Sequence, residues 1–229
     1  MKTWAKLLFA LLILCRSGHA QGFINLDFES AHLSSYGAGP ASVPALSAVP
    51  GWTVYYQGNP YPYILYNAVS LGGAAVILEG TNADYPLPPI QGNWFVHIQG
   101  GWSNGGSAGI GQTGQIPIDA QTLVFWGSYE NMIISFSGQP LTFAVLGGTP
   151  NYTIYGADIS AYAGQIGELL FTGLDGSSRP GPFPYGGGGF IDNIQFSPSP
   201  VPEPSNLALG VLGGLLLLKL PRWRKAPQN

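Results

Sequence analysis

Positively charged side chains are scarce in this sequence, and their absence from the middle of the chain excludes several kinds of ligand. Asp, Glu, Lys and Arg together make up 8% of the 229 residues, whereas roughly 25% is typical of soluble globular domains. Among the 8 Lys and Arg residues, Arg179 is the only one between Arg16 and Lys219. Nucleic acids are bound through clustered Lys and Arg. The middle of the chain is therefore not a nucleic-acid-binding domain, and an anionic polymer would need a bridging divalent cation.

Cysteine and long helix-forming stretches are also missing. Cys15 is the single cysteine and lies near the N-terminus, so the rest of the chain has no disulfide and no thiolate metal site. The 34 glycines and 20 prolines interrupt the chain too often for long helices. Because 45% of the residues are hydrophobic, the chain can still build a sizeable core. This composition favours an all-β fold of short strands joined by turns.

Residues 1–20 have the pattern of a secretory signal peptide. Two lysines precede the apolar run Leu7–Leu14, and small residues stand at Gly18 and Ala20, the positions that a signal peptidase reads. We expect cleavage after Ala20. A lipoprotein signal ending at Cys15 is the alternative, but the leucine before Cys15 is large for that cleavage and the arginine after it is unusual.

Residues 199–229 form a distinct tail. A Pro-Glu-Pro motif at 202–204 precedes the uncharged run Leu207–Leu218, which lies within a hydrophobic segment of about residues 206–220. A basic cluster of Arg222, Arg224 and Lys225 follows. At 1.5 Å per residue the uncharged run covers about 18 Å, less than the ~30 Å hydrocarbon core of a bilayer. We expect a short membrane segment with the basic cluster on the cytoplasmic side.

This order of motif, hydrophobic segment and basic cluster resembles the PEP-CTERM sorting signal, with Pro202, Glu203 and Pro204 as its signature. The resemblance covers about residues 201–225. It implies processing by an exosortase, a membrane-embedded enzyme of Gram-negative bacteria that make extracellular polysaccharide. The protein would then be exported, held transiently at the inner membrane, and passed to the cell envelope, the outer surface or the extracellular matrix.

Residues 21–198 read as one antiparallel β-sandwich, because short apolar or alternating segments are separated by turn residues. The only helical turn that we expect is Ile159–Ala163, with Asp158 as its N-cap and Gly164 at its end. The predicted strands are Ile24–Phe28, Trp52–Tyr55, Ala74–Leu78, Trp94–Gln99, Thr122–Ser128, Met132–Ser137, Leu141–Leu146, Tyr152–Tyr155, Leu169–Phe171 and Phe190–Phe196.

The segments 25–29 (Asn-Leu-Asp-Phe-Glu), 158–171 and 190–194 (Phe-Ile-Asp-Asn-Ile) resemble jelly-roll modules of carbohydrate-binding and cell-surface proteins. The resemblance implies that the first and last strands lie together, with a structural calcium ion where their acids meet. Asp27, Glu29 and Asp192 are the predicted ligands, and Asn193 is a weaker candidate. Alternatively, Asp192 and Asn193 form a turn or a solvated edge and Glu29 points outward. No other cofactor is required.

Aromatic residues gather in one stretch, from Trp52 to Tyr66, and two more tryptophans flank a later loop. Flat rings with polar rims can stack on the faces of sugars, and they can equally form the core of a sandwich. We assign Trp52 and Trp94 to the core. The residues predicted to stack on sugars are Tyr56, Tyr61, Tyr63 and Trp102.

Matches to catalytic motifs lack the structural context that their chemistry needs. The Gly-x-Ser-x-Gly match at 105–109 lies in what reads as a glycine-rich loop leading to Pro117, and the glycines at 109, 111 and 114 have no βαβ unit around them. Glu79 and Asp84 could serve as the acid and base of a glycosidase, but nothing in the sequence places them in one cleft. His97 reads as a structural or solvent-facing residue.

The sequence therefore predicts a non-catalytic, exosortase-sorted protein of the envelope or extracellular matrix, which engages polysaccharide. A secreted glycan-active hydrolase is one alternative. A structural surface protein or adhesin without a small ligand is another.

Overall fold

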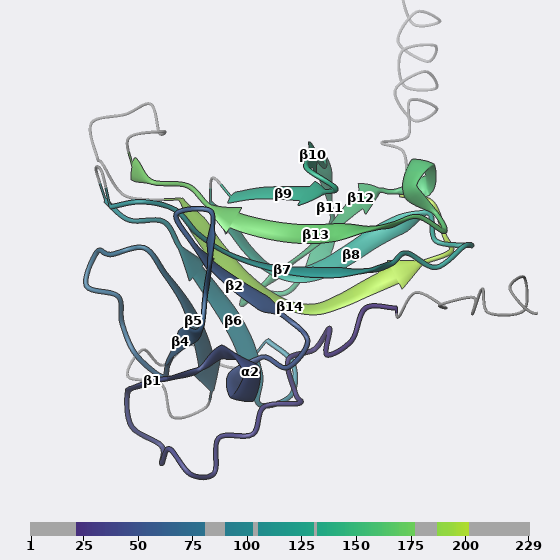
Figure 1. Cartoon of the computed structure of the whole chain (residues 1–229). Helices are drawn as coiled ribbons and strands as arrows, with labels where there is room; N and C mark the ends of the chain where they lie inside the picture. Colours follow the sequence, from purple (N-terminus) through teal and green to yellow (C-terminus); the bar gives the residue numbers. More distant parts are fainter. Residues whose placement is uncertain (1–21, 81–89, 103–104, 131, 177–186, 202–229) are drawn as a thin grey trace, which may run out of the picture.

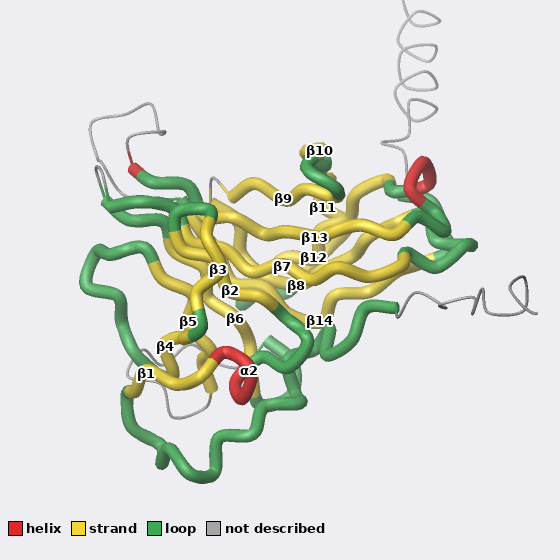
Figure 2. Tube along the Cα trace, in the orientation of Figure 1, coloured by secondary structure: helices red, strands yellow, loops and turns green. Residues whose placement is uncertain are grey.

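The computed structural model describes residues 22–80, 90–102, 105–130, 132–176 and 187–201. The predicted signal peptide, the Pro-Glu-Pro motif, the basic cluster and Asp84 lie outside these residues. Strands are the main regular structure of the described part, and loops connect them (Figures 1 and 2). Within the ranges given above, no helix is both long and apolar enough to cross a bilayer.

The strands form two sheets, which confirms the predicted all-β, antiparallel-rich sandwich. All paired neighbours are antiparallel except β4 and β5. The eight-stranded sheet has the order β1 (Ala41–Pro44), β4 (Tyr63–Tyr66), β5 (Ala75–Gly80), β6 (Trp94–Gln99), β14 (Gly188–Ser197), β8 (Thr122–Glu130), β12 (Thr153–Asp158) and β11 (Phe143–Gly148). The six-stranded sheet has the order β10 (Gln139–Pro140), β9 (Met132–Phe136), β13 (Ile166–Gly173), β7 (Ala108–Gln115), β2 (Thr53–Tyr56) and β3 (Asn59–Tyr61).

The core lies between the two sheets and takes alternate residues from each strand, as the pleat requires. Leu169 and Phe171 of β13 are buried on one side, and Val96 and Ile98 of β6 on the other. Phe125 of β8 packs edge-on against Phe171, with ring centroids 5.8 Å apart. Burial of each such side chain contributes about 1.5–3 kcal/mol to folding.

Nine of the ten predicted strands overlap a strand of the structure, and the segment 94–99 coincides with β6. The strand predicted over 24–28 is wrong. Asn25 and Phe28 have φ angles of 50° and 57°, in the left-handed region, so this segment forms turns. It still lies beside the last strand, because the Ile194 N–H donates to the Leu26 carbonyl over 2.9 Å.

The prediction of a loop over residues 105–117 is wrong for residues 108–115. These residues form β7, which occupies the centre of the six-stranded sheet. Its glycines are needed for close packing. A Cβ atom at Gly109 would lie 2.6 Å from the Phe171 carbonyl oxygen of the neighbouring strand. A strand built for close approach lacks the β-branched residues from which strands are recognised.

The complete helical elements in the described ranges are one short α-helix and one 3₁₀ turn. The predicted turn near residue 160 is present as η1 (Ser160–Tyr162). The Asp158 carboxylate accepts the Ser160 N–H over 2.9 Å, and Gly164 follows with a φ of 75°. The short helix α2 (Ala45–Ala48) was not predicted.

The two ends of the described body meet at one end of the sandwich (Figure 1). Gly22 forms a bridge with Gln115 at the last residue of β7. The rings of Phe23 and Phe196 lie with centroids 5.0 Å apart, and Ser197 of β14 pairs with Thr122.

Candidate functional site

A tight hairpin positions the tyrosines that the sequence singled out. Strands β2 and β3 pair with Tyr56 opposite Asn59, so two residues form the turn. These residues, Gln57 and Gly58, have φ angles of 50° and 76°, as a type I′ turn requires. Tyr56 ends β2 and Tyr61 ends β3. Tyr63, two residues after Tyr61, begins β4. The turn chemistry thus brings the three strand ends to one place.

The three tyrosines contact one another at the surface. The ring centroids of Tyr56 and Tyr61 lie 6.2 Å apart at 48°, and those of Tyr61 and Tyr63 lie 6.1 Å apart at 64°. Their exposed fractions are 41%, 51% and 47%. The inclined rings do not form one flat platform, and a ligand between them would meet ring surfaces from more than one direction.

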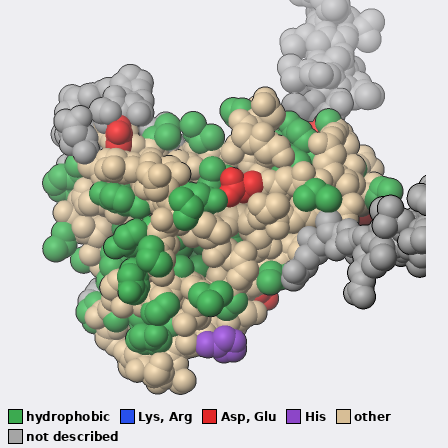
Figure 3. All heavy atoms as spheres, in the orientation of Figure 1, with side chains coloured by type: hydrophobic (Ala, Val, Ile, Leu, Met, Phe, Trp, Pro, Cys, Tyr) green, Lys and Arg blue, Asp and Glu red, His purple; other side chains and the backbone are tan. Residues whose placement is uncertain are grey.

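These tyrosines line a cleft of about 400 Å³, which we call the tyrosine cleft. It opens between β2 of one sheet and β4 and β5 of the other, where Val54, Ile64 and Val76 form its apolar side. Among the described residues, those that line it include no charged side chain. The face drawn in Figure 3 shows hydrophobic side chains gathered over the region of β1, β2 and β4, and no Lys or Arg among the residues described there.

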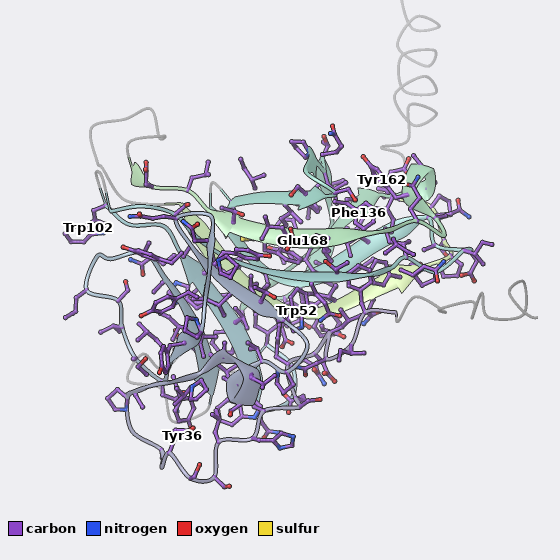
Figure 4. All side chains as sticks on the ribbon, viewed as in Figure 1. Tyr36, Trp52, Trp102, Phe136, Tyr162 and Glu168 are labelled. Atoms are coloured by element: carbon purple, nitrogen blue, oxygen red, sulfur yellow. The ribbon has the colours of Figure 1, made fainter. Side chains whose placement is uncertain are left out.

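Trp102 does not line the tyrosine cleft, so three of the four predicted stacking residues come together and the fourth does not. Trp102 lies at the extremity of the molecule, away from the labelled Trp52 and Glu168 (Figure 4). Its backbone N–H donates to the Gly72 carbonyl over 3.0 Å, and a Cβ atom at Gly72 would lie 3.0 Å from its ring. Its side chain is 50% exposed.

Trp52 and Trp94 belong to the core, as predicted. Trp52 is buried and its indole N–H donates to the Asn25 carbonyl over 2.9 Å. Trp94 packs against the core and the ring of Tyr66, with centroids 5.6 Å apart.

Tyr55 turns to the outward face of the six-stranded sheet. Its hydroxyl donates to the Glu168 carboxylate over 2.5 Å. This hydrogen bond, with burial and the negative charge of Glu168, raises the pKa of Tyr55 to about 12.

The predicted calcium ligands lie in one neighbourhood, where backbone amides already satisfy part of their charge. Glu29 accepts the N–H groups of Asn93 and Trp94 over 2.7 and 2.9 Å, and the Asn93 side-chain amide over 2.9 Å. Asp27 accepts the Glu29 N–H over 3.3 Å. Glu29 therefore fixes the start of β6, a role that the sequence did not reveal.

Asp192 is fully buried at an irregularity in the pairing of β14 with β8. It accepts the N–H groups of Gln91 and Asn193 over 2.9 and 2.6 Å. The pKa of Asp192 is raised to about 7, mainly by burial. The two hydrogen bonds oppose this rise, and the negative charges of Glu29 and Asp27 add to it.

No group of three or more His, Cys, Asp or Glu side chains in the described part of the chain has an arrangement that could hold a metal ion. Oxygen donors alone suit Ca²⁺ in principle, since each carboxylate oxygen can accept more than one partner. Calcium binding by Asp27, Glu29 and Asp192 stays a prediction.

A second cavity, of about 300 Å³, contains a pair that the sequence did not bring together. Glu79 of β5 is buried, and its carboxylate lies 3.0 Å from Nδ1 of His97 on β6. The register pairs Ile77 with His97, which leaves Glu79 two residues along on the same face. Only that register links the two residues, and single-sequence reasoning had no access to it.

No protein-family model matches this sequence, and no curated protein matches it. Among solved structures, a family 61 carbohydrate-binding module in complex with β-1,4-galactotriose is 15% identical, with a TM-score of 0.38, over 77% of this chain and 98% of that chain. A family 29 carbohydrate-binding module is 12% identical, with a TM-score of 0.36, over 74% and 98%. A family 11 module from Clostridium thermocellum, in complex with a β-1,3-1,4-mixed-linked tetrasaccharide, is 11% identical, with a TM-score of 0.32, over 69% and 95%.

Proposed function

We propose that this chain is a non-catalytic protein that binds an uncharged polysaccharide through the tyrosine cleft. The observation that carries the proposal is the gathering of Tyr56, Tyr61 and Tyr63 around one apolar cleft by a two-residue turn. Large exposed aromatic side chains are costly to leave in water, and those that cluster at a cleft mark a binding surface.

The chemistry of the cleft suits a sugar chain. A pyranose ring offers an apolar face of C–H groups, which the tyrosine rings and the Val54 and Ile64 side chains can cover. The tyrosine hydroxyls and Ser42 can exchange hydrogen bonds with sugar hydroxyl groups. The cleft volume of about 400 Å³ is near the lower end of the roughly 300–1,000 Å³ of small-molecule sites, which favours a few sugar units of a longer chain.

The charge of the protein favours an uncharged glycan. No Lys or Arg lies among the described residues, and no charged side chain lines the cleft. A polymer of acidic sugars would bring charges that nothing at this cleft neutralises.

The cleft lacks the groups of a glycoside hydrolase. Such enzymes place two carboxyl groups about 5–10 Å apart on either side of the scissile bond. In the part of the chain that the structure describes, the residues that line the tyrosine cleft include no Asp and no Glu. Binding without turnover is therefore the activity that this geometry supports.

Delivery to the cell surface is the second part of the proposal and is supported by the sequence. Export would begin at the signal peptide of residues 1–20. An exosortase would then process the tail at the motif Pro202, Glu203 and Pro204. The body would reach the envelope or the extracellular matrix, where polysaccharide is available. Fractionation of the host with and without Glu203→Ala tests this part: the variant should stay at the inner membrane.

Binding is tested by titrating the full chain with a panel of neutral polysaccharides, using isothermal calorimetry. Tyr61→Ala should weaken binding by about tenfold or more, because a lost ring stack of about 1.5 kcal/mol corresponds to a factor of ten. Tyr36→Ala is the matched control, since Tyr36 is 38% exposed and does not line the cleft. Equal affinities of the two variants would refute the cleft as the site, and no binding across the panel would favour a structural coat protein.

A further inference from the structure

The cavity that contains Glu79 and His97 lies on the outward face of the eight-stranded sheet. Val76 and Leu78 of β5 point into the core, so Ile77 and Glu79 point to the opposite face. Strand β6 alternates in the same way, with His97 and Gln99 turned outward. Phe190 of β14 pairs with His97 and completes the base of the cavity, and residues 68–72 form its remaining wall.

The base of this cavity combines a carboxylate with two aromatic rings in contact. The Glu79 carboxylate lies 3.0 Å from Nδ1 of His97, and the other ring nitrogen, Nε2, is directed away from Glu79. The His97 ring lies on Phe190 with centroids 4.5 Å apart at 40°. Gln99 adds an amide with both donor and acceptor groups.

We propose that this cavity is a second binding site, which takes a single uncharged sugar ring. Its volume of about 300 Å³ is at the bottom of the range for small-molecule sites, so it fits one ring better than a chain. Phe190 and His97 supply an apolar surface, while Glu79 and Gln99 are hydrogen-bonding groups for the ring hydroxyls.

The second site is separate from the tyrosine cleft. Val76 of β5 lines the tyrosine cleft, whereas Ile77 and Glu79 line this cavity on the other side of the strand. The inference therefore does not require the tyrosine cleft to bind anything. If both sites are active, one molecule holds a sugar chain on one face of the sheet and a single sugar ring on the opposite face.

Histidine resonances give a direct readout, because the chain has only 3 histidines. The full chain, labelled with ¹⁵N-histidine, is titrated with glucose, galactose, mannose and N-acetylglucosamine at millimolar concentration. At least one sugar should shift the His97 ring resonances saturably. The resonances of exposed His32, which does not line the cavity, should stay in place. No His97 shift with any of the four sugars overturns the proposal.

Two variants separate this site from the tyrosine cleft. In Tyr61→Ala the His97 shift should persist with unchanged affinity, and its loss would overturn the assignment of a separate site. Gln99→Ala should weaken the same titration severalfold, because it removes an amide group that lines the cavity. An unchanged affinity in Gln99→Ala would overturn the placement of the sugar in this cavity.

Discussion

The tyrosine cleft and the carboxylate neighbourhood of Asp192 differ in almost every physical property. The cleft has exposed rings, an apolar side and no charge. The carboxylates are buried or half-buried, and the oxygen atoms of Asp192 and Glu29 accept backbone N–H groups from the segment 91–94. The aromatic rings of the cleft face solvent, whereas the carboxylates of the Asp192 region are engaged by hydrogen bonds within the protein. Substitutions in the carboxylate region should therefore change stability, and those in the cleft should change ligand affinity.

The largest expected effect is a loss of stability as the pH rises toward the pKa of Asp192 in the folded protein. Its pKa is about 7 in the folded protein, against an ordinary value of 3.8. The stability that this group contributes is complete below pH 3.8 and is lost as the pH rises to 7. Unfolding free energy should fall by up to about 4 kcal/mol over this window. Urea denaturation at a series of pH values measures it.

Asp192→Asn is the control for this pH dependence, because the amide does not titrate. The decrease between pH 4 and 7 should disappear in this variant. A decrease that survives the substitution would assign it to another group.

Calcium gives the next largest effect if the predicted ligands bind it. The cation favours ionised Asp192, so it should raise the unfolding temperature most above pH 7. At one hundred times its Kd, calcium would contribute about 2.7 kcal/mol. Thermal unfolding with calcium or with a chelator decides the question, and identical curves would show the calcium prediction to be wrong.

Glu29→Ala should destabilise the protein by about 2 kcal/mol, because three donors of residues 93 and 94 lose a charged acceptor. Glu29→Gln keeps a carbonyl oxygen as acceptor and should cost less. The polysaccharide affinity should not change in either variant when it is measured under conditions in which the variant is folded. A change in affinity with Glu29→Ala would show that the two regions are coupled.

The smallest expected effect is on the stability of the cleft variant. Tyr61→Ala removes a side chain that is 51% exposed, so the unfolding free energy should change by only about 0.5 kcal/mol. The tenfold loss of affinity would then belong to the ligand contact. A large loss of stability would instead identify the tyrosines as structural.

Strands were predictable from the sequence where apolar residues are large, and turns where glycine is in a tight loop. β6 follows from its own alternation, because Val96 and Ile98 must share a face. β7 could not be found in this way. A glycine such as Gly109 is needed there because the backbone of Phe171 on the neighbouring strand lies too close for a side chain, and no local sequence pattern reveals this contact. The strand predicted at 24–28 failed for the opposite reason. Phe28 lies in a turn and its side chain is buried, so the alternation of apolar and polar residues resembles that of a strand.

The candidate sites were predictable to the extent that they are local in sequence. Tyr56, Tyr61 and Tyr63 lie within eight residues, and a two-residue turn is enough to group them. Trp102 was misplaced with them because its position depends on packing against Gly72. The Glu79–His97 pair depends on the register of two strands, which no local pattern specifies.

Strand β7 also determines how the body can be mounted on a surface. Its first residue, Ala108, lines the tyrosine cleft, and its last residue, Gln115, meets Gly22 where the body begins. Seven steps of strand separate them, about 23 Å. The last strand ends near the same place, since Ser197 pairs with Thr122. A tether leaving from either end of the body therefore departs from the end remote from the cleft, and the aromatic cleft faces away from whatever the tether is attached to.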